Sequence, residues 1–158
     1  MAYQQVREIL NSVRQFHRRL RHEVDAAYPG TDDPRAKFLL RSIRRGEQEL
    51  DLALAKYAKE GERSVLDTWI QYVPTEEIET VLLSGELPPH SSPEDILEWK
   101  LEFDASLADF YRQLADQVSA PRAKELLESQ AALIEQRLSD QSWQAREEYL
   151  APDKDEAS

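Results

Sequence analysis

The chain of 158 residues has no cysteine, only four glycines and no long apolar run, and each shortage excludes a class of protein. Without cysteine there are no disulfides, thiolate metal sites or cysteine nucleophiles. Four isolated glycines leave no glycine-rich phosphate loop and little room for a turn-rich β architecture. No apolar run approaches the ~20 residues that span a bilayer, and Arg7 and Glu8 interrupt the first apolar residues. We therefore expect a cytoplasmic protein with neither a secretory signal nor a membrane partner.

Charged residues are abundant and unevenly distributed. The net charge is −11, but residues 1–60 carry +3 and residues 61–158 carry −14. Nucleic-acid binding requires a concentrated positive surface, so the acidic total argues against nucleic acid as a partner. The basic first part of the chain is instead a candidate surface for an acidic partner.

Apolar residues recur at spacings of three and four, the pattern that predicts helices with one buried face. This pattern places four long helices at about 3–27, 34–61, 93–118 and from 121 onward. Asp32 or Asp33 can cap the second of them and Ser92 the third, each with proline in the first turn. The sequence therefore predicts an all-α fold, a four-helix bundle over residues 1–146 made of two hairpins.

Residues 62–92 interrupt the helical pattern and are predicted to form a long crossover between the hairpins. A short helix from about Val65 to Tyr72 would end at Pro74, and another would run from Thr75 to near Gly85. The crossover is either a plain connector or a functional lid. Residues 147–158 are polar and acidic, which predicts a disordered tail.

Two segments of the chain are similar to each other. Residues 34–42 match residues 121–129 at seven of nine positions, and a weaker pair, residues 16–20 and 110–114, lies upstream of each. A repeated hairpin with one long connection is one way to form a four-helix bundle. Over residues 3–140 the chain resembles the ferritin-like superfamily, and rubrerythrin-like domains most closely. The resemblance lies in the helix lengths, the long crossover, the repeat and the segment FYRQLA at 110–115.

The resemblance implies a di-iron centre, of which this chain keeps little. Active members place one Glu on each of two helices and Glu-x-x-His on the other two. The matching positions keep two carboxylates, Glu47 and Asp104, whereas the other four hold Leu10, Leu50, Ile134 and Arg137. We therefore expect iron binding to be lost. In a shifted register, the candidate ligands of iron or another divalent metal are His17, Glu23, Glu98, Glu102, Glu128 and Glu135.

Two carboxylates at one level of a bundle repel unless a cation or a proton separates them. We predict that Arg137 supplies this cation, so that Glu47, Arg137 and Asp104 form a buried charge cluster. In the alternative, Arg137 extends to solvent and Glu47 lies at the edge of the apolar face. His17 and Gln130 also lie on apolar faces, where they either line a small polar pocket or bond to a neighbour in the core.

The first two helices also carry a set of arginines that would form a positive patch if their faces adjoin. They are Arg14, Arg18, Arg21, Arg41, Arg44 and Arg45. The patch could bind an acidic protein or the acidic part of a second copy, or its members could pair locally with neighbouring acids such as Glu8 and Asp25. Trp69 and Tyr72 of the crossover, if exposed, would add an apolar contact surface.

The sequence thus predicts a non-catalytic ferritin-like bundle that acts as a binding or interaction module, has no catalytic residue and no resident cofactor, and forms a homodimer as related bundles commonly do. The alternative is a divergent rubrerythrin-like oxidoreductase with one or two metal ions. Such an enzyme would need an outside reductant, since the chain has no cysteine for a rubredoxin-type electron-transfer unit.

Overall fold

The computed structural model describes residues 3–84, 87–88 and 90–144, and this part of the chain is predominantly helical. The helices are α1 (Val6–Ala27), α2 (Pro34–Glu60), α3 (Arg63–Leu66), α4 (Thr75–Ser84), α5 (Pro93–Gln117) and α6 (Pro121–Gln144), with a 3₁₀ turn η1 at Tyr28–Gly30. Two short strands, β1 (Gln4–Gln5) and β2 (Trp69–Ile70), complete the elements. The all-α prediction is therefore confirmed, while the predicted tail at 147–158 lies outside the described residues. None of the described helices combines the length and hydropathy needed to cross a membrane.

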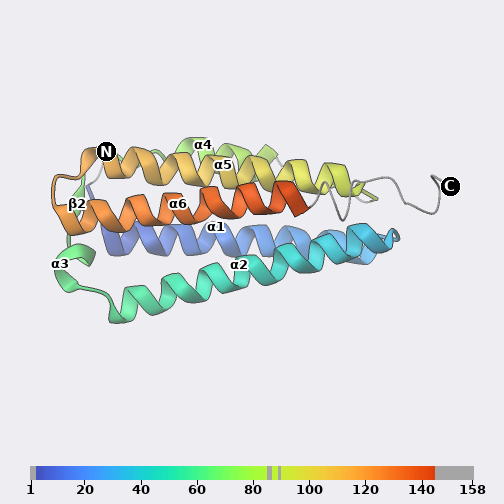
Figure 1. Ribbon diagram of the computed structural model, residues 1–158, viewed down its shortest axis with the longest axis horizontal. Helices are drawn as coiled ribbons and strands as arrows, with labels where there is room; N and C mark the ends of the chain where they lie inside the picture. The colour runs from blue at the N-terminus through green and yellow to red at the C-terminus, as the bar shows by residue number, and fades with distance from the viewer. Residues whose placement is uncertain (1–2, 85–86, 89, 145–158) are drawn as a thin grey trace.

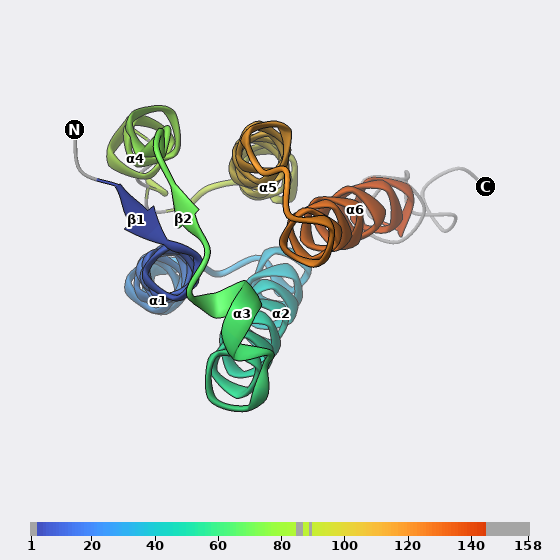
Figure 2. The same cartoon turned by 90° about the vertical axis from the view of Figure 1, so that its left-hand side faces the viewer.

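The long helices form two antiparallel hairpins, α1 with α2 and α5 with α6 (Figure 1). The hairpins meet chiefly where α2 packs on α5. The end-on view shows that α4 lies against both α1 and α5, on the side of α5 away from α6 (Figure 2). The crossover therefore covers the α1–α5 side of the molecule with α4, whereas α3 contacts α6 only near the end of α2 and the start of α6.

Local sequence signals explain where the long helices begin and end. Asp33 caps α2 by accepting a hydrogen bond at 2.9 Å from the backbone N–H two residues on, and Pro34 occupies the first helical position. Ser92 caps α5 in the same way, at 3.1 Å from the N–H three residues on. At the end of α2, a Cβ on Gly61 would lie 2.6 Å from the carbonyl oxygen of Tyr57, so this end of the helix requires glycine.

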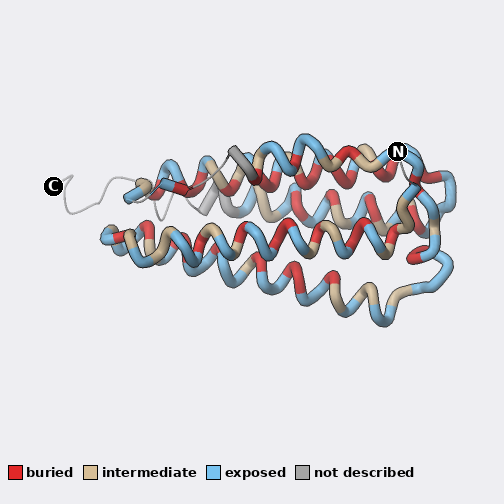
Figure 3. Tube along the Cα trace, turned by 180° about the vertical axis from the view of Figure 1, so that it is seen from behind, coloured by how far each residue is buried: buried red, intermediate tan, exposed pale blue. Residues whose placement is uncertain are grey.

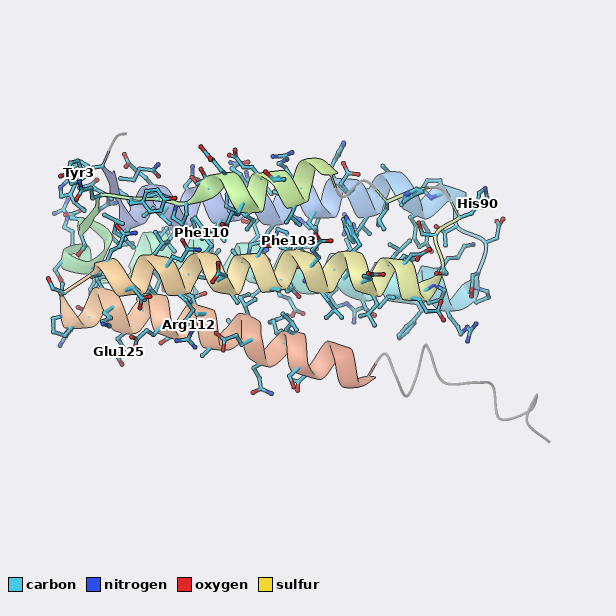
Figure 4. All side chains as sticks on the ribbon, turned by 90° about the horizontal axis from the view of Figure 1, so that it is seen from above. Tyr3, His90, Phe103, Phe110, Arg112 and Glu125 are labelled. Carbon is cyan, nitrogen blue, oxygen red and sulfur yellow. The ribbon has the colours of Figure 1, made fainter. Side chains whose placement is uncertain are left out.

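Buried side chains line the inward faces of the long helices, as their apolar spacing predicts (Figure 3). The largest side chains of the long helices with almost no exposed surface are Phe103, Phe110, Tyr111, Ile9, Leu10, Leu20, Leu40, Ile96, Leu107 and Leu114. Phe16 on α1 meets Phe110 on α5 edge to face, with ring centroids 6.1 Å apart. Figure 4 shows Phe103 and Phe110 one after the other along α5. One apolar core thus joins the two hairpins.

The crossover differs from its prediction in one respect. The predicted short helix stops at Leu66, and Trp69 and Ile70 instead form β2, which pairs antiparallel with β1. The Val6 N–H donates to the Thr68 carbonyl at 2.9 Å, so the residues before Val6 bond to the crossover instead of extending α1. The pairing buries Ile70 and leaves Trp69 exposed.

Candidate functional site: a buried ion cluster and an adjoining groove

Four ionisable side chains from three helices meet in the interior of the protein. They are His17 on α1, Glu47 on α2, and Lys100 and Asp104 on α5, and none is more than 3% exposed. Lys100 Nζ lies 2.7 Å from Glu47 Oε1 and donates a hydrogen bond to Asp104 Oδ1. His17 donates from Nδ1 to the other oxygen of Glu47. We call these four side chains the ion cluster.

The ion cluster is buried because its members occupy apolar positions of their helices. His17 lies four residues after Val13, and Glu47 lies four residues after Ile43, so each falls on the face that packs into the core. The ring of Phe103 closes one side of the cluster, with its centroid 5.7 Å from Lys100 Nζ and 6.2 Å from the centre of the His17 ring. The charges therefore sit in a medium of low polarity, where each needs a partner.

The two carboxylates of the ion cluster have opposite pKa shifts. Burial alone would raise the pKa of Glu47, but the charge of Lys100 and the hydrogen bond from His17 outweigh burial and lower this pKa to about 2. Burial raises the pKa of Asp104, the negative charge of Glu47 adds to the rise, and Lys100 opposes it only in part. Asp104 is therefore the carboxylate of the pair that takes up a proton first as the pH falls.

Lys100 is a fixed cation. Burial alone would lower its pKa, but the charges of Glu47 and Asp104 outweigh burial and raise the pKa above its ordinary value. The side chain is thus an ammonium group, which donates hydrogen bonds and has no lone pair for nucleophilic attack. Chemically, the cluster can neutralise buried charge and hold three helices together.

The structure brings Glu47 and Asp104 into one cluster, but the cation between them differs from the prediction. Arg137 on α6 is about one-third exposed, and its Nη2 lies 3.9 Å from Glu49 Oε2, outside the ion cluster. The reason is that α6 packs on α5 and not closely on α2, so Arg137 does not reach Glu47. Lys100, on α5 itself, lies one helical turn before Asp104 and fills the place between the two carboxylates.

His17 and Gln130 lie in different surroundings. His17 bonds to Glu47, which is the core alternative considered from the sequence. Gln130 on α6 is half-buried, and none of the hydrogen bonds between described residues joins it to His17.

The arginines of the first hairpin are largely engaged within it. Arg14, Arg18 and Arg21 converge from α1 on Asp51 of α2, with N–O distances of 2.7, 3.3 and 3.0 Å. Arg44 pairs with Asp25 at 2.7 Å. Arg41 and Arg45 are exposed on α2. The predicted positive patch is therefore divided, since four of its six arginines pair with an acid on the other helix and hold the two helices together.

The predicted aromatic surface is exposed. Trp69 is 59% exposed and Tyr72 49%, and Tyr3 is exposed at the same end of the molecule (Figure 4). The backbone N–H of Tyr72 donates to Gln117 Oε1 at 3.0 Å, which ties this part of the crossover to α5.

A groove of about 510 Å³ lies between α2, α5 and α6, and Lys100 connects it with the ion cluster. Its apolar lining comes from Leu39 and Ile43 of α2, Leu97 of α5 and Leu133 of α6. Its charged lining comes from Arg45 and Glu49 of α2 and Arg137 and Asp140 of α6. Neither Lys100 nor this groove was foreseen from the sequence. The signal for Lys100 was present, because it lies on the apolar face four residues before Asp104.

Fold and site together define a predominantly helical protein with an enclosed ion network beside an open groove. Over the residues that the structure describes, no group of three or more His, Asp or Glu side chains is arranged to hold a metal ion. Comparisons with protein-family models, curated proteins and solved structures return no significant match.

Proposed function

We propose that the protein is a non-catalytic, ferritin-like four-helix bundle that acts as a cytoplasmic binding module, with Lys100 performing the structural task of the metal ions in related bundles. The observation that carries this proposal is the position of the Lys100 ammonium between the buried carboxylates of Glu47 and Asp104. Two antiparallel hairpins joined by a long crossover support the ferritin-like arrangement.

The donor set of the ion cluster does not fit a di-iron centre. Such a centre uses four carboxylates to offset the charge of two metal ions, whereas the cluster has two carboxylates and one protein cation between them. A metal ion entering the cluster would have to displace Lys100 and leave its charge buried without a partner. Leaving a buried charge without a partner costs about 3–5 kcal/mol of stability, and this cost opposes metal binding.

The enclosed position of the ion cluster also supports a non-catalytic role. Its four members are at most 3% exposed, and of these four Lys100 alone reaches the lining of the groove, where it is already paired with Glu47 and Asp104. The accessible feature next to the cluster is the groove between α2, α5 and α6, whose volume and mixed apolar and charged lining are typical of binding sites. We therefore assign binding to the groove and structural support to the cluster.

Metal content tests this proposal directly. Untagged protein would be analysed by plasma mass spectrometry as purified and again after aerobic incubation with ferrous iron and removal of unbound metal. We expect less than stoichiometric iron, manganese and zinc in both samples. Roughly two metal ions per chain, as a di-metal bundle holds, would overturn the proposal and revive the oxidoreductase alternative.

A matched variant separates metal in the ion cluster from metal on the acidic surface. The double substitution Glu47→Gln and Asp104→Asn removes both carboxylates of the cluster and nearly preserves their shape. Metal that the wild type binds and this folded variant loses would lie in the cluster, against the proposal. Metal that both proteins bind equally would lie on the surface, as expected for a chain with a net charge of −11.

A further inference from the structure

The side of the molecule between α2 and α6 is open. Both helices pack on α5, yet a groove of about 510 Å³ separates them, and Leu39, Ile43 and Leu97 form its apolar lining. Leu133 stands on the α6 wall with 40% of its surface exposed. An exposed leucine beside an apolar groove is a feature of protein interaction sites.

The charged residues along the groove restrict what can occupy it. Lys100 also lines the groove, but its charge is paired within the ion cluster. Of the other charged residues, Arg45 and Arg137 are balanced by Glu49 and Asp140, and the contact of Arg137 with Glu49 is loose at 3.9 Å. A partner of a single charge, such as a nucleic acid or an acidic peptide, would meet two like charges. A surface with two charges of each sign can instead pair with itself across a two-fold axis, as symmetric dimers require.

Gly46 gives an independent indication of a close neighbour. It lies in the middle of α2, where glycine costs about 0.5–1 kcal/mol relative to alanine. A Cβ at this position would meet only Arg137 Nη1, at an ordinary 3.5 Å, so packing within the chain does not require glycine. The absence of a side chain on the groove wall would let the backbone of a second molecule approach α2.

We propose that this groove is a homodimer interface, in which a second copy of the chain docks through a two-fold axis with Leu133 near the centre. The inference rests on the proposed function, since it names the partner of the groove. In this arrangement Arg45 and Arg137 of each copy face Glu49 and Asp140 of the other. The apolar floor of the groove is covered, and the loose pair within each chain gains partners across the interface.

Mass in solution tests the interface, by size exclusion with light scattering and by sedimentation equilibrium. The wild type is expected to be a dimer and Leu133→Asp a monomer with unchanged helical circular dichroism. Leu52→Asp is the matched control, because Leu52 is 61% exposed on α2, another helix of the groove, but does not line the groove. This control should stay dimeric. A monomeric wild type, or equal dissociation by both variants, would overturn the proposal.

Exchanging the charges tests the two-fold pairing without touching the apolar residues. One variant carries Arg45→Glu and Arg137→Glu, which makes the groove acidic apart from the paired Lys100, and the other carries Glu49→Arg and Asp140→Arg, which makes it entirely basic. Each should be monomeric alone, and an equimolar mixture should form dimers. Dimers of either variant alone, or no dimer in the mixture, would overturn the proposal. The proposed function is tested separately by metal content, so the homodimer interface and the non-catalytic role can fail independently of each other.

Discussion

Glu47 and Asp104 share one cation, but they are held very differently. Glu47 has Lys100 near one oxygen and His17 bonded to the other, whereas among the described residues Asp104 bonds to Lys100 alone, through Oδ1. The opposite directions of their pKa shifts follow from this difference. The two carboxylates should therefore contribute unequally to stability.

Neutralising the two carboxylates one at a time measures this inequality. Glu47→Gln should lower the free energy of unfolding by about 3–5 kcal/mol, because a buried cation loses its main partner. Asp104→Asn should cost about 1 kcal/mol, since Lys100 keeps Glu47 and an already disfavoured charge is removed. Urea denaturation followed by circular dichroism would give both values. Equal losses would contradict the assignment of Glu47 as the principal partner.

The lowered pKa of Glu47 also predicts how stability depends on pH. Its pKa is about 2 in the folded protein and near 4.5 when unperturbed, so its contribution is fully present above pH 4.5 and lost as the pH falls towards 2. The stability difference between the wild type and Glu47→Gln should therefore shrink over this range. Denaturation curves at successive pH values would show it, and a constant difference would exclude this role of Glu47.

At the residue scale, helical spacing was enough to place His17 and Glu47 on inward faces, whereas Asp104 was placed by its position in the repeat. It did not identify Lys100, because lysine on a helix is normally assigned to the solvent side. Spacing also cannot say how far a side chain reaches across a bundle. Arg137 was therefore assigned to the ion cluster on its position in the repeat, although the groove keeps α6 away from Glu47.

Among the elements, α1 and α2 are joined by more than apolar contacts. Asp51 is buried on α2, and three arginines of α1 bond to its two oxygens. Burial alone would raise the pKa of Asp51, but the hydrogen bonds from Arg14 and Arg18 outweigh it and lower this pKa. Asp51 thus acts as a central anchor for the first hairpin.

Replacing Asp51 by asparagine tests whether its charge holds α1 and α2 together. Asp51→Asn should lower the free energy of unfolding by about 2 kcal/mol, because three guanidinium groups lose their common counter-charge. Asp25→Asn is the matched control, since Asp25 forms an exposed pair with Arg44 and should cost no more than about 0.5 kcal/mol. Thermal and urea denaturation would compare the two. A loss for Asp51→Asn no larger than the control would contradict the anchor.

The long helices were predictable because each has its own periodicity and three of the four begin at a proline, Pro34, Pro93 or Pro121. The strands β1 and β2 were not, because two-residue strands show no alternation. Each strand forms because it pairs with the other, so the residues near each one carry no sequence pattern that predicts a strand. The predicted short helix over Val65 to Tyr72 failed for this reason, since tertiary pairing outweighed local preference.

For the molecule as a whole, the sequence predicted helical content, the hairpin order and the inward faces. It did not predict which helices of one hairpin pack on the other, because an apolar face shows that a helix is buried but not which helix covers it. The position of α4 against α1 and α5, and the open side between α2 and α6, follow from how the two hairpins meet. Only the three-dimensional arrangement shows them.

The β1–β2 pairing has a consequence for the order in which the protein folds. It joins residues 5 and 69, whereas α1 and α2 are connected within a few residues around Thr31. Closing the longer loop costs more chain entropy and is slower, so the first hairpin should form before the strands pair. Because the chain has no cysteine, a single Gln5→Cys can carry a dye that Trp69 quenches on contact. Quenching should lag behind the helical signal during refolding, and simultaneous signals would refute this order. Pairing of β1 with β2 would then show, late in refolding, that the hairpin of α1 and α2 has already formed.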